Sequence, residues 1–238
     1  MLTTLTSTVG HRLAGRAKGL FTAFAATSAA HLGSLLTDAT RVEQATKPAL
    51  MPLLAAHAVS GEGPAPRLLA PALLASTAGD VLLQFSTEPA FLAGMGAFAA
   101  AHICYIVMFA RQGALTDRRR TVLVGCAYAA TWVVMLGLLW PGLGKLQLPV
   151  AGYSLLLAGT AVTAAGLGLR AGLGGGLFLL SDTLIATRLA NWRALPGHEF
   201  WIMSTYLAAQ YLLATAALKA EAGAGAGAGA EARDEPAR

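Results

Sequence analysis

Charged side chains are scarce in this chain. Only 12% of its 238 residues are Asp, Glu, Lys or Arg, whereas 55% are hydrophobic. Soluble domains typically carry about 25% charged residues, because charged side chains cover the surface that faces water. The shortage excludes a disordered or collagen-like protein and argues against a soluble enzyme. The 17 Lys and Arg sit in short clusters between long uncharged runs, which is typical of a polytopic membrane protein.

Cysteines and familiar catalytic motifs are also scarce. Cys104 and Cys126 lie inside apolar runs, without the spacing of a metal site or the density of a disulfide framework, so we expect two buried packing residues. The chain contains neither Gly-x-Ser-x-Gly nor His-Glu-x-x-His. The glycine-rich segment 172–176 lacks the Lys-Ser/Thr of a phosphate-binding loop, and we expect it to let two helices approach closely. No metal or cofactor is predicted.

The chain consists largely of long uncharged runs. A helix needs about 20 mainly apolar residues to cross the hydrocarbon core of a bilayer. Such runs predict an all-α bundle of about eight transmembrane helices, at residues 19–37, 48–60, 68–86, 89–110, 121–144, 146–169, 174–190 and 200–218. The second run begins at Lys47-Pro48, and proline is well placed at a first helical position.

Three parts of the chain are expected from this pattern. Residues 1–18 form a basic N-terminal segment and residues 19–219 the transmembrane domain. Residues 220–238 form a disordered tail without function, because its alternating glycines oppose a stable helix. The tryptophans are expected at the membrane interfaces, where amphipathic rings gather, at Trp132, Trp140, Trp192 and Trp201.

The basic residues predict the orientation in the membrane. Lys and Arg favour cytoplasmic loops. If the N-terminus is cytoplasmic, twelve of the 17 Lys and Arg lie in cytoplasmic segments. The cluster Arg118-Arg119-Arg120 decides this orientation. Its functional alternative is binding to nucleic acid or anionic lipid, but a topology signal explains the cluster more simply. We expect both termini in the cytoplasm, no nucleic-acid partner, and a bacterial inner membrane, in keeping with a composition rich in Ala and Gly.

Two aspartates lie where a membrane helix should carry no charge. Asp80 and Asp182 are near the middles of their runs, where a charge costs about 2.5–3.5 kcal/mol on insertion scales. Two carboxyl groups in a partly dry cavity form a simple acid–base pair, because like charges that lie close together favour keeping one proton. The structural alternative is a hydrogen bond from each aspartate to a neighbouring helix. We expect Asp80 and Asp182 to be catalytic, with the acid and base roles left unassigned.

Other polar residues accompany the aspartates at helical spacing. Ser76, Asp80 and Gln84 follow one another at intervals of four residues, so they share one helical face. The pairs His102 with Tyr105 and Tyr206 with Gln210 do the same, although His102 could equally be a satisfied core histidine. The pattern predicts a polar cavity inside the bundle, open toward the outer side. We expect its substrate-binding residues to be Lys47, His102, Tyr105, Ser181, Tyr206 and Gln210.

The polar positions together resemble one family. The resemblance runs from about Thr46 to Leu213, and five short motifs carry it in order: Lys47-Pro48, Gly79-Asp80 followed by Leu82-Leu83, His102 with Tyr105, Phe178-Leu179-Leu180-Ser181-Asp182, and Tyr206-Leu207-Ala208-Ala209-Gln210. This pattern resembles the YhhN-like lysoplasmalogenases, a family of multi-helix membrane proteins. The resemblance implies hydrolysis of the vinyl ether bond of lysoplasmalogens, which gives a fatty aldehyde and a glycerophosphoethanolamine or -choline. The implied partners are a lysophospholipid and the bilayer.

The residues suit that chemistry independently of the resemblance. Vinyl ether hydrolysis begins with protonation of the β-carbon, and water then captures the oxocarbenium ion. Asp80 and Asp182 supply the acid and the stabilising carboxylate, while Tyr206, Gln210 and His102 position water or substrate. Lys47 binds the substrate phosphate or pairs with an aspartate. The alternatives are a proton-coupled transporter that uses the same aspartates and a non-catalytic lipid-binding protein.

Overall fold

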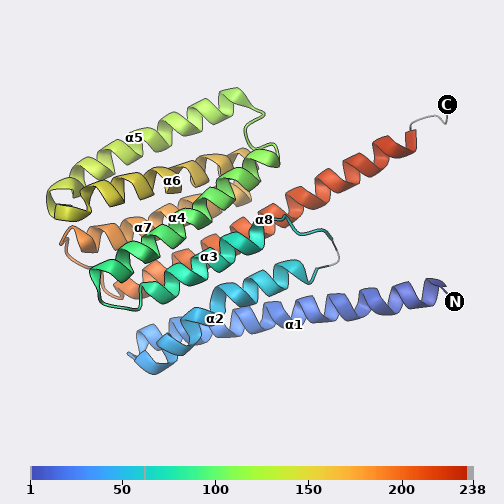
Figure 1. The fold of residues 1–238 in the computed structure, drawn as a ribbon, viewed down its shortest axis with the longest axis horizontal. Coiled ribbons are helices and arrows are strands. Elements are labelled where there is room, and N and C mark those ends of the chain that lie inside the picture. Colours follow the sequence, from blue (N-terminus) through green and yellow to red (C-terminus); the bar gives the residue numbers. More distant parts are fainter. Residues whose placement is uncertain (1, 62, 235–238) are drawn as a thin grey trace.

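The protein is all-helical. The computed structural model describes residues 2–61 and 63–234, with side chains within residues 15–61 and 63–226. The described residues form eight α-helices, one turn of 3₁₀ helix and no strand (Figure 1). Their bounds are α1 Leu2–Leu36, α2 Thr40–Val59, α3 Leu69–Leu82, α4 Glu88–Arg111, α5 Arg118–Leu143, η1 Gly144–Leu146, α6 Gln147–Gly166, α7 Leu169–Leu189 and α8 His198–Asp234. The predicted all-α fold is confirmed, while the number of membrane crossings and the side of the termini stay predictions.

Helices that follow one another in the chain also pack side by side. α1 packs on α2, α3 on α2 and α4, and α7 on α6 and α8, while α4 contacts α6 across the bundle. α5 packs along α6 at one edge, and α1 lies at the opposite edge (Figure 1). The N-terminal end of α1 and the C-terminal end of α8 lie at the same end of the bundle (Figure 1). The turns before α2, α4, α6 and α8 therefore gather at the other end.

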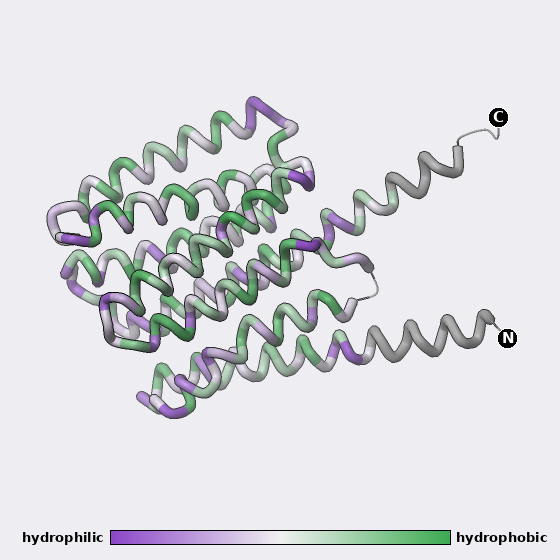
Figure 2. The backbone as a smooth tube through the Cα atoms, in the orientation of Figure 1, coloured by the Kyte–Doolittle hydropathy of each residue, from purple (hydrophilic) through white to green (hydrophobic). Residues whose placement is uncertain are grey.

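The outer surface of the bundle suits lipid. Four helical stretches are long and apolar enough to cross a membrane, at Gly15–Leu36, Glu88–Arg111, Arg118–Gly166 and Leu169–Leu189. The third comprises α5, η1 and α6, and α5 exposes more than half of Leu123, Val133 and Leu138. Figure 2 shows apolar stretches along the helices, with hydrophilic segments mostly near the turns. The protein is an integral membrane protein, because such a surface is stable only against hydrocarbon.

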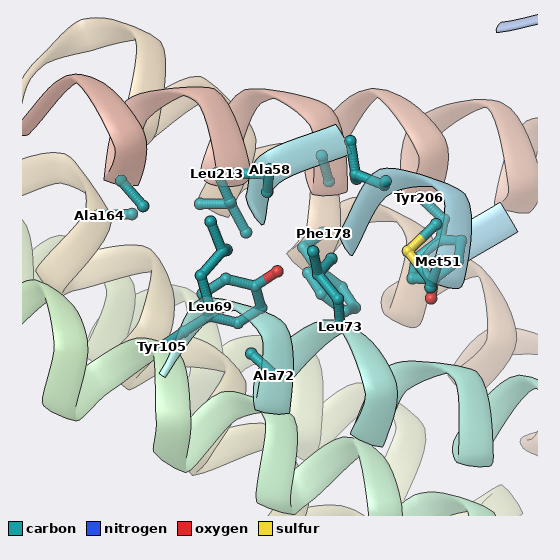
Figure 3. Close-up of a cluster of buried hydrophobic side chains, with 14 of the residues drawn as sticks. Met51, Ala58, Leu69, Ala72, Leu73, Tyr105, Ala164, Phe178, Tyr206 and Leu213 are labelled. Atoms are coloured by element: carbon teal, nitrogen blue, oxygen red, sulfur yellow. The ribbon is translucent and has the colours of Figure 1, made fainter. Parts of the chain in front are cut away.

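The core lies where α2, α3, α4, α7 and α8 meet. Figure 3 shows part of it, with Leu69 and Leu73 of α3 near Tyr105 of α4 and Phe178 of α7. Glycine allows the closest approaches. A Cβ added to Gly175 would lie 2.7 Å from Ala161 Cα, so the glycine-rich segment 172–176 does let α6 and α7 pack closely, as predicted.

The start of the second helix differs from the prediction. α2 begins at Thr40, and Pro48 lies inside it and not at its first position. A proline inside a helix removes one backbone hydrogen bond, which neighbouring groups can compensate in a membrane protein. The carbonyl that loses its N–H partner at Pro48 is that of Gln44, four residues earlier. The helix nevertheless continues through both Pro48 and Pro52, and Lys47 lies in its middle.

Three further expectations differ from the structure. α8 is helical through Asp234, although the alternating glycines predicted no helix beyond residue 220; it extends an existing helix, which needs no new nucleus, and alanine favours it. Cys126 is exposed, because it lies on the outer face of α5. Trp132 lies in the middle of α5, and its indole donates to Ser154 of α6 (2.8 Å). The division of the chain into segment, domain and tail stays a prediction.

Candidate active site

A cavity of about 450 Å³ lies inside the bundle, at the end opposite the described chain ends. Residues of α2, α3, α4, α6, α7 and α8 line it. Asp80 and Asp182 both lie in this lining, together with Lys47, Ser181 and Tyr206. The two aspartates, far apart in sequence, therefore share one chamber. Its opening on the side away from the termini fits the predicted cavity, and the side of the membrane stays a prediction.

Asp80 lies in a tightly packed environment. It is 3% exposed, and the Tyr206 hydroxyl donates to its Oδ2 at 2.8 Å. Its neighbour Gly79 allows the ring of Phe98 to approach, because a Cβ there would lie 2.5 Å from that ring. Any side chain at position 79 would therefore push the α4 aromatic away from Asp80.

A closed hydrogen-bond network lies behind Asp80. The Tyr105 hydroxyl donates to Gln210 Oε1 at 2.6 Å, and Gln210 Nε2 donates to Ser76 Oγ at 3.0 Å. All three residues are fully buried, and they tie α3, α4 and α8 together. Ser76 stands one turn before Asp80 on the same face, as the spacing predicted. The network fixes the helix that carries Asp80.

Asp182 lies in a more open environment. It is half-buried, and its Oδ2 accepts a short hydrogen bond from the Tyr153 hydroxyl of α6. His102 Nε2 lies 3.2 Å from the same hydroxyl, and His102 Nδ1 lies 3.1 Å from Thr160 Oγ1. A consistent assignment has Thr160 donate to Nδ1 and the Nε2 proton donate to Tyr153. The imidazole is then neutral, and a directed chain of hydrogen bonds ends at Asp182.

One aromatic side chain links the two aspartate environments. The ring of Phe178 lies 4.7 Å from that of His102 and 5.5 Å from that of Tyr206, measured between centroids. Phe178 is fully buried. His102, which supports Asp182, and Tyr206, which supports Asp80, therefore both pack on one rigid group.

The charged rim of the cavity lies at its mouth. Arg188 of α7 forms a salt bridge with Glu199 of α8, the only one among the described side chains. Lys47 is half-buried and lines the cavity, and within the described part of the chain it has no such partner. Both roles expected for Lys47, phosphate binding and pairing with an aspartate, stay predictions. A free ammonium group at the mouth suits an anionic substrate group.

Sequence comparison identifies the family. A model of the YhhN family matches residues 42–217, which is well over half of the chain and includes all the residues of α3, α4, α6 and α7. This chain belongs to the YhhN family. The match confirms the resemblance seen in the five motifs, because all of them lie within it.

Curated relatives in the YhhN family carry an enzyme's name. A lysoplasmalogenase of Mycobacterium bovis is 38% identical over 139 residues, which are 56% of this chain and 52% of that protein. Lysoplasmalogenase TMEM86B of Sus scrofa is 36% identical over 167 residues, 70% of each chain. The Homo sapiens protein of that name is 34% identical over 165 residues, 68% of each. The chain thus spans about half the length of the mycobacterial relative. No solved structure matches it.

Not every residue expected in this YhhN site faces the cavity. Lys47, Ser181 and Tyr206 line it with the aspartates, although the Ser181 hydroxyl donates to the Ile202 carbonyl at 3.0 Å. The other three are fully buried behind the cavity wall, at His102, Tyr105 and Gln210. They reach the cavity only through Tyr153 or the network behind Asp80.

Sequence reasoning missed Tyr153 and Thr160. Both lie in a long charge-free run of α6, which was not predicted to carry a polar face. Their separation by seven residues, two helical turns, was the available signal. Two hydroxyl groups on one face of an otherwise apolar membrane helix indicate a buried partner. That partner is His102, which lies between them.

Proposed function

We propose that this protein is a membrane-embedded hydrolase that cleaves the vinyl ether bond of lysoplasmalogens. The products are a fatty aldehyde and a glycerophosphoethanolamine or -choline. The name lysoplasmalogenase, printed for several relatives, supports the substrate class. The observation that carries the proposal is that Asp80 and Asp182 line one cavity, each bonded to a tyrosine hydroxyl.

The first chemical step is transfer of a proton to carbon. One aspartate, in its carboxylic acid form, protonates the β-carbon of the vinyl ether, whose double bond supplies the electron pair. The positive charge then lies on the adjacent carbon and the ether oxygen. The second, ionised aspartate stabilises this oxocarbenium ion, because opposite charges attract strongly where water is scarce. Such a step needs no metal and no cofactor.

Water completes the reaction and resets the two groups. The second aspartate takes a proton from water as its oxygen bonds to the cationic carbon, which gives a hemiacetal. The first aspartate takes the hemiacetal hydroxyl proton, and the second returns its proton to the glycerol oxygen as the C–O bond breaks. Both aspartates then regain their starting states. One water is consumed, and one aldehyde and one alcohol are released.

The surrounding residues have supporting roles in this proposal. Tyr206 and Tyr153 each hold one carboxyl group, and His102 acts through Tyr153. Gln210 and Tyr105 act through Ser76 on the helix that bears Asp80. We assign these as positioning residues, because hydrogen bonds fix catalytic groups in their productive geometry. Lys47, at the mouth, binds the substrate phosphate.

Aldehyde release from lysoplasmenyl-ethanolamine and -choline tests the proposal directly. The detergent-purified protein should release aldehyde, and Asp80→Asn and Asp182→Asn should each lower kcat by at least about 100-fold. The matched control is Asp117→Asn. Asp117 caps α5 by accepting from the Arg120 backbone N–H (3.0 Å), and asparagine caps equally well. This control should keep full activity.

Two results would contradict the proposal in different ways. Aldehyde release that survives both substitutions contradicts the two-carboxylate mechanism but keeps the substrate. No release from either headgroup contradicts the substrate itself. Proton uptake into vesicles that carry the purified protein, abolished by the same two substitutions, would then favour the transporter alternative.

A further inference from the structure

A second, narrower space lies beside the cavity, between α5 and α7. It is a crevice of about 70 Å³, floored by α6. Met135 and Leu136 of α5 line one wall, Leu179 of α7 lines the other, and Leu157 and Ala158 belong to the floor. Asp182 is the one charged residue in its lining. The crevice is therefore suited to an apolar occupant.

The packing of α5 explains why the crevice exists. α5 packs along α6 but makes little contact with α7, and Figure 1 shows it at the edge of the bundle. The Trp132 indole, which donates to Ser154 of α6 at 2.8 Å, lines the crevice. This bond keeps the large ring against α6, so the space between α5 and α7 is left unfilled. The role of this mid-helix tryptophan is otherwise unexplained.

The crevice and the cavity share part of their lining, including the proposed catalytic residue Asp182. Val150, Tyr153, Asp182 and Ala186 line both spaces. Asp182 can therefore be approached from two directions. One leads to the charged mouth with Lys47 and Arg188, and the other leads between α5 and α7.

We propose that this crevice holds the first few methylenes of the lysolipid's hydrocarbon chain, with the bond to be cleaved at Asp182. The inference rests on the proposed function. A lysoplasmalogen is polar on one side of its vinyl ether and a hydrocarbon on the other. Placing that bond at the junction puts the phosphate in the cavity that Lys47 lines and the first methylenes of the alkenyl chain in the crevice. Each part of the molecule then meets a matching surface.

The surroundings of α5 favour this occupant. The outer face of α5 exposes Val133 and Leu138, 61% and 56% exposed, to the lipid phase. A chain in the crevice therefore stays near hydrocarbon while its head enters the cavity. Charged side chains line the cavity mouth at Glu43, Lys47, Arg188 and Glu199, where an alkyl chain would have to displace water.

Filling the crevice tests the inference through chain length. Ala158→Leu adds three carbon atoms to the floor, and kcat/KM should fall about fourfold for each chain methylene displaced. Substrates with one headgroup and alkenyl chains of about 2 or about 18 carbons separate the effects, because a chain that ends at the vinyl group places no methylene in the crevice. We expect kcat/KM to fall about tenfold for the long-chain substrate and to change little for the short-chain substrate. The matched control is Ala130→Leu on the exposed face of α5, which should leave both unchanged.

A binding measurement keeps the inference testable without turnover. The probe is an ester lysophosphatidylcholine with a diazirine a few carbons from the ester, photo-crosslinked to the full protein. Label on the α5 segment with Trp132 and Met135, lost in Ala158→Leu, supports the inference even if no aldehyde is released. Label on Met95 and Met203 of the cavity instead would overturn it. An equal loss for both chain lengths, or none, would also overturn it while the hydrolase proposal stands. A parent protein that is labelled in the crevice but releases no aldehyde leaves the chain site supported and contradicts the hydrolase.

Discussion

The two aspartates of the cavity lie in different surroundings. Asp80 is 3% exposed and backed by a network of fully buried polar residues. Asp182 is half-buried, and it lines both the cavity and the crevice. Each accepts a hydrogen bond from one tyrosine hydroxyl, Tyr206 for Asp80 and Tyr153 for Asp182. The same aspartate–tyrosine pair thus occurs twice, once in the closed environment of Asp80 and once in the more open environment of Asp182.

The different surroundings of Asp80 and Asp182 should give substitutions near them different effects on protein stability. The polar groups behind Asp80, namely Ser76, Tyr105 and Gln210, are sealed from water, so removing one leaves others without partners, and this costs folding free energy. Groups around Asp182 border open space, where water can replace a lost partner. We therefore expect substitutions near Asp80 to lower stability and activity together. Those near Asp182 should lower activity with a smaller loss of stability, because only the fully buried His102 loses a partner that water cannot replace.

The largest expected effect comes from Tyr153→Phe. The change removes the hydroxyl between His102 and Asp182, so the carboxyl group loses its fixed position. Loss of a single preorganised donor typically costs about 100-fold in kcat, which aldehyde release would measure. The same change leaves the fully buried His102 Nε2 without its partner, so the thermal unfolding midpoint should also fall, but by less than when a group of the network behind Asp80 is removed.

Tyr206→Phe is the matched comparison, because it removes the equivalent hydroxyl from Asp80. It should lower both kcat and the unfolding midpoint. Equal loss of stability in the two variants would break the distinction between the closed and open environments.

Gln210→Leu should give the largest loss of stability. It leaves the Tyr105 and Ser76 hydroxyls buried without their partners, and each orphaned group costs about 1–3 kcal/mol. Thermal unfolding in detergent measures the loss. Adding Tyr105→Phe removes one orphaned group, so the double variant should be more stable than the sum of the single changes predicts. Strict additivity would show that the network is not coupled.

Lys47→Gln should have a smaller effect, confined to binding. If the ammonium group binds the substrate phosphate, KM should rise about tenfold with kcat unchanged, and the parent's KM alone should rise with salt. Lys145→Gln is the control, because Lys145 is an exposed lysine of η1 that does not line the cavity. A fall in kcat with unchanged KM would instead give Lys47 a part in the chemistry.

Much of this arrangement follows from the sequence, for physical reasons. Charge-free runs locate membrane helices because hydrocarbon excludes charge, and the described helices overlap all eight predicted runs. Asp80 and Asp182 stand out for the same reason. Intervals of four residues correctly placed Ser76 beside Asp80 and Tyr206 beside Gln210 on shared faces.

Other features depend on contacts between helices and could not be predicted from one helix at a time. Tyr153 gains its importance only because α6 packs beside α4 and α7. His102, Tyr105 and Gln210 looked like cavity residues, since helical spacing gives a shared face but not the depth of that face. Pro48 misled the prediction of α2, because proline is favoured at a first helical position but is also tolerated inside a membrane helix, and α2 contains both Pro48 and Pro52.

The smallest effect tests the two environments through their glycines. Gly176 lies in α7, ahead of Asp182, and a Cβ there would meet only the Tyr128 hydroxyl, at 3.6 Å. Gly176→Ala should therefore keep activity and raise stability by about 0.4–1 kcal/mol, because alanine has less freedom to lose on folding. Gly79→Ala, beside Asp80, makes the same chemical change where a Cβ would lie 2.5 Å from the Phe98 ring. That variant should lose about 1–3 kcal/mol through overpacking, and activity with it as the ring moves against Asp80. Unfolding midpoints of the two variants measure the contrast. A destabilised Gly176→Ala would mean that the Asp182 side is as tightly packed as the Asp80 side, and the open route to Asp182 would then lose its physical basis.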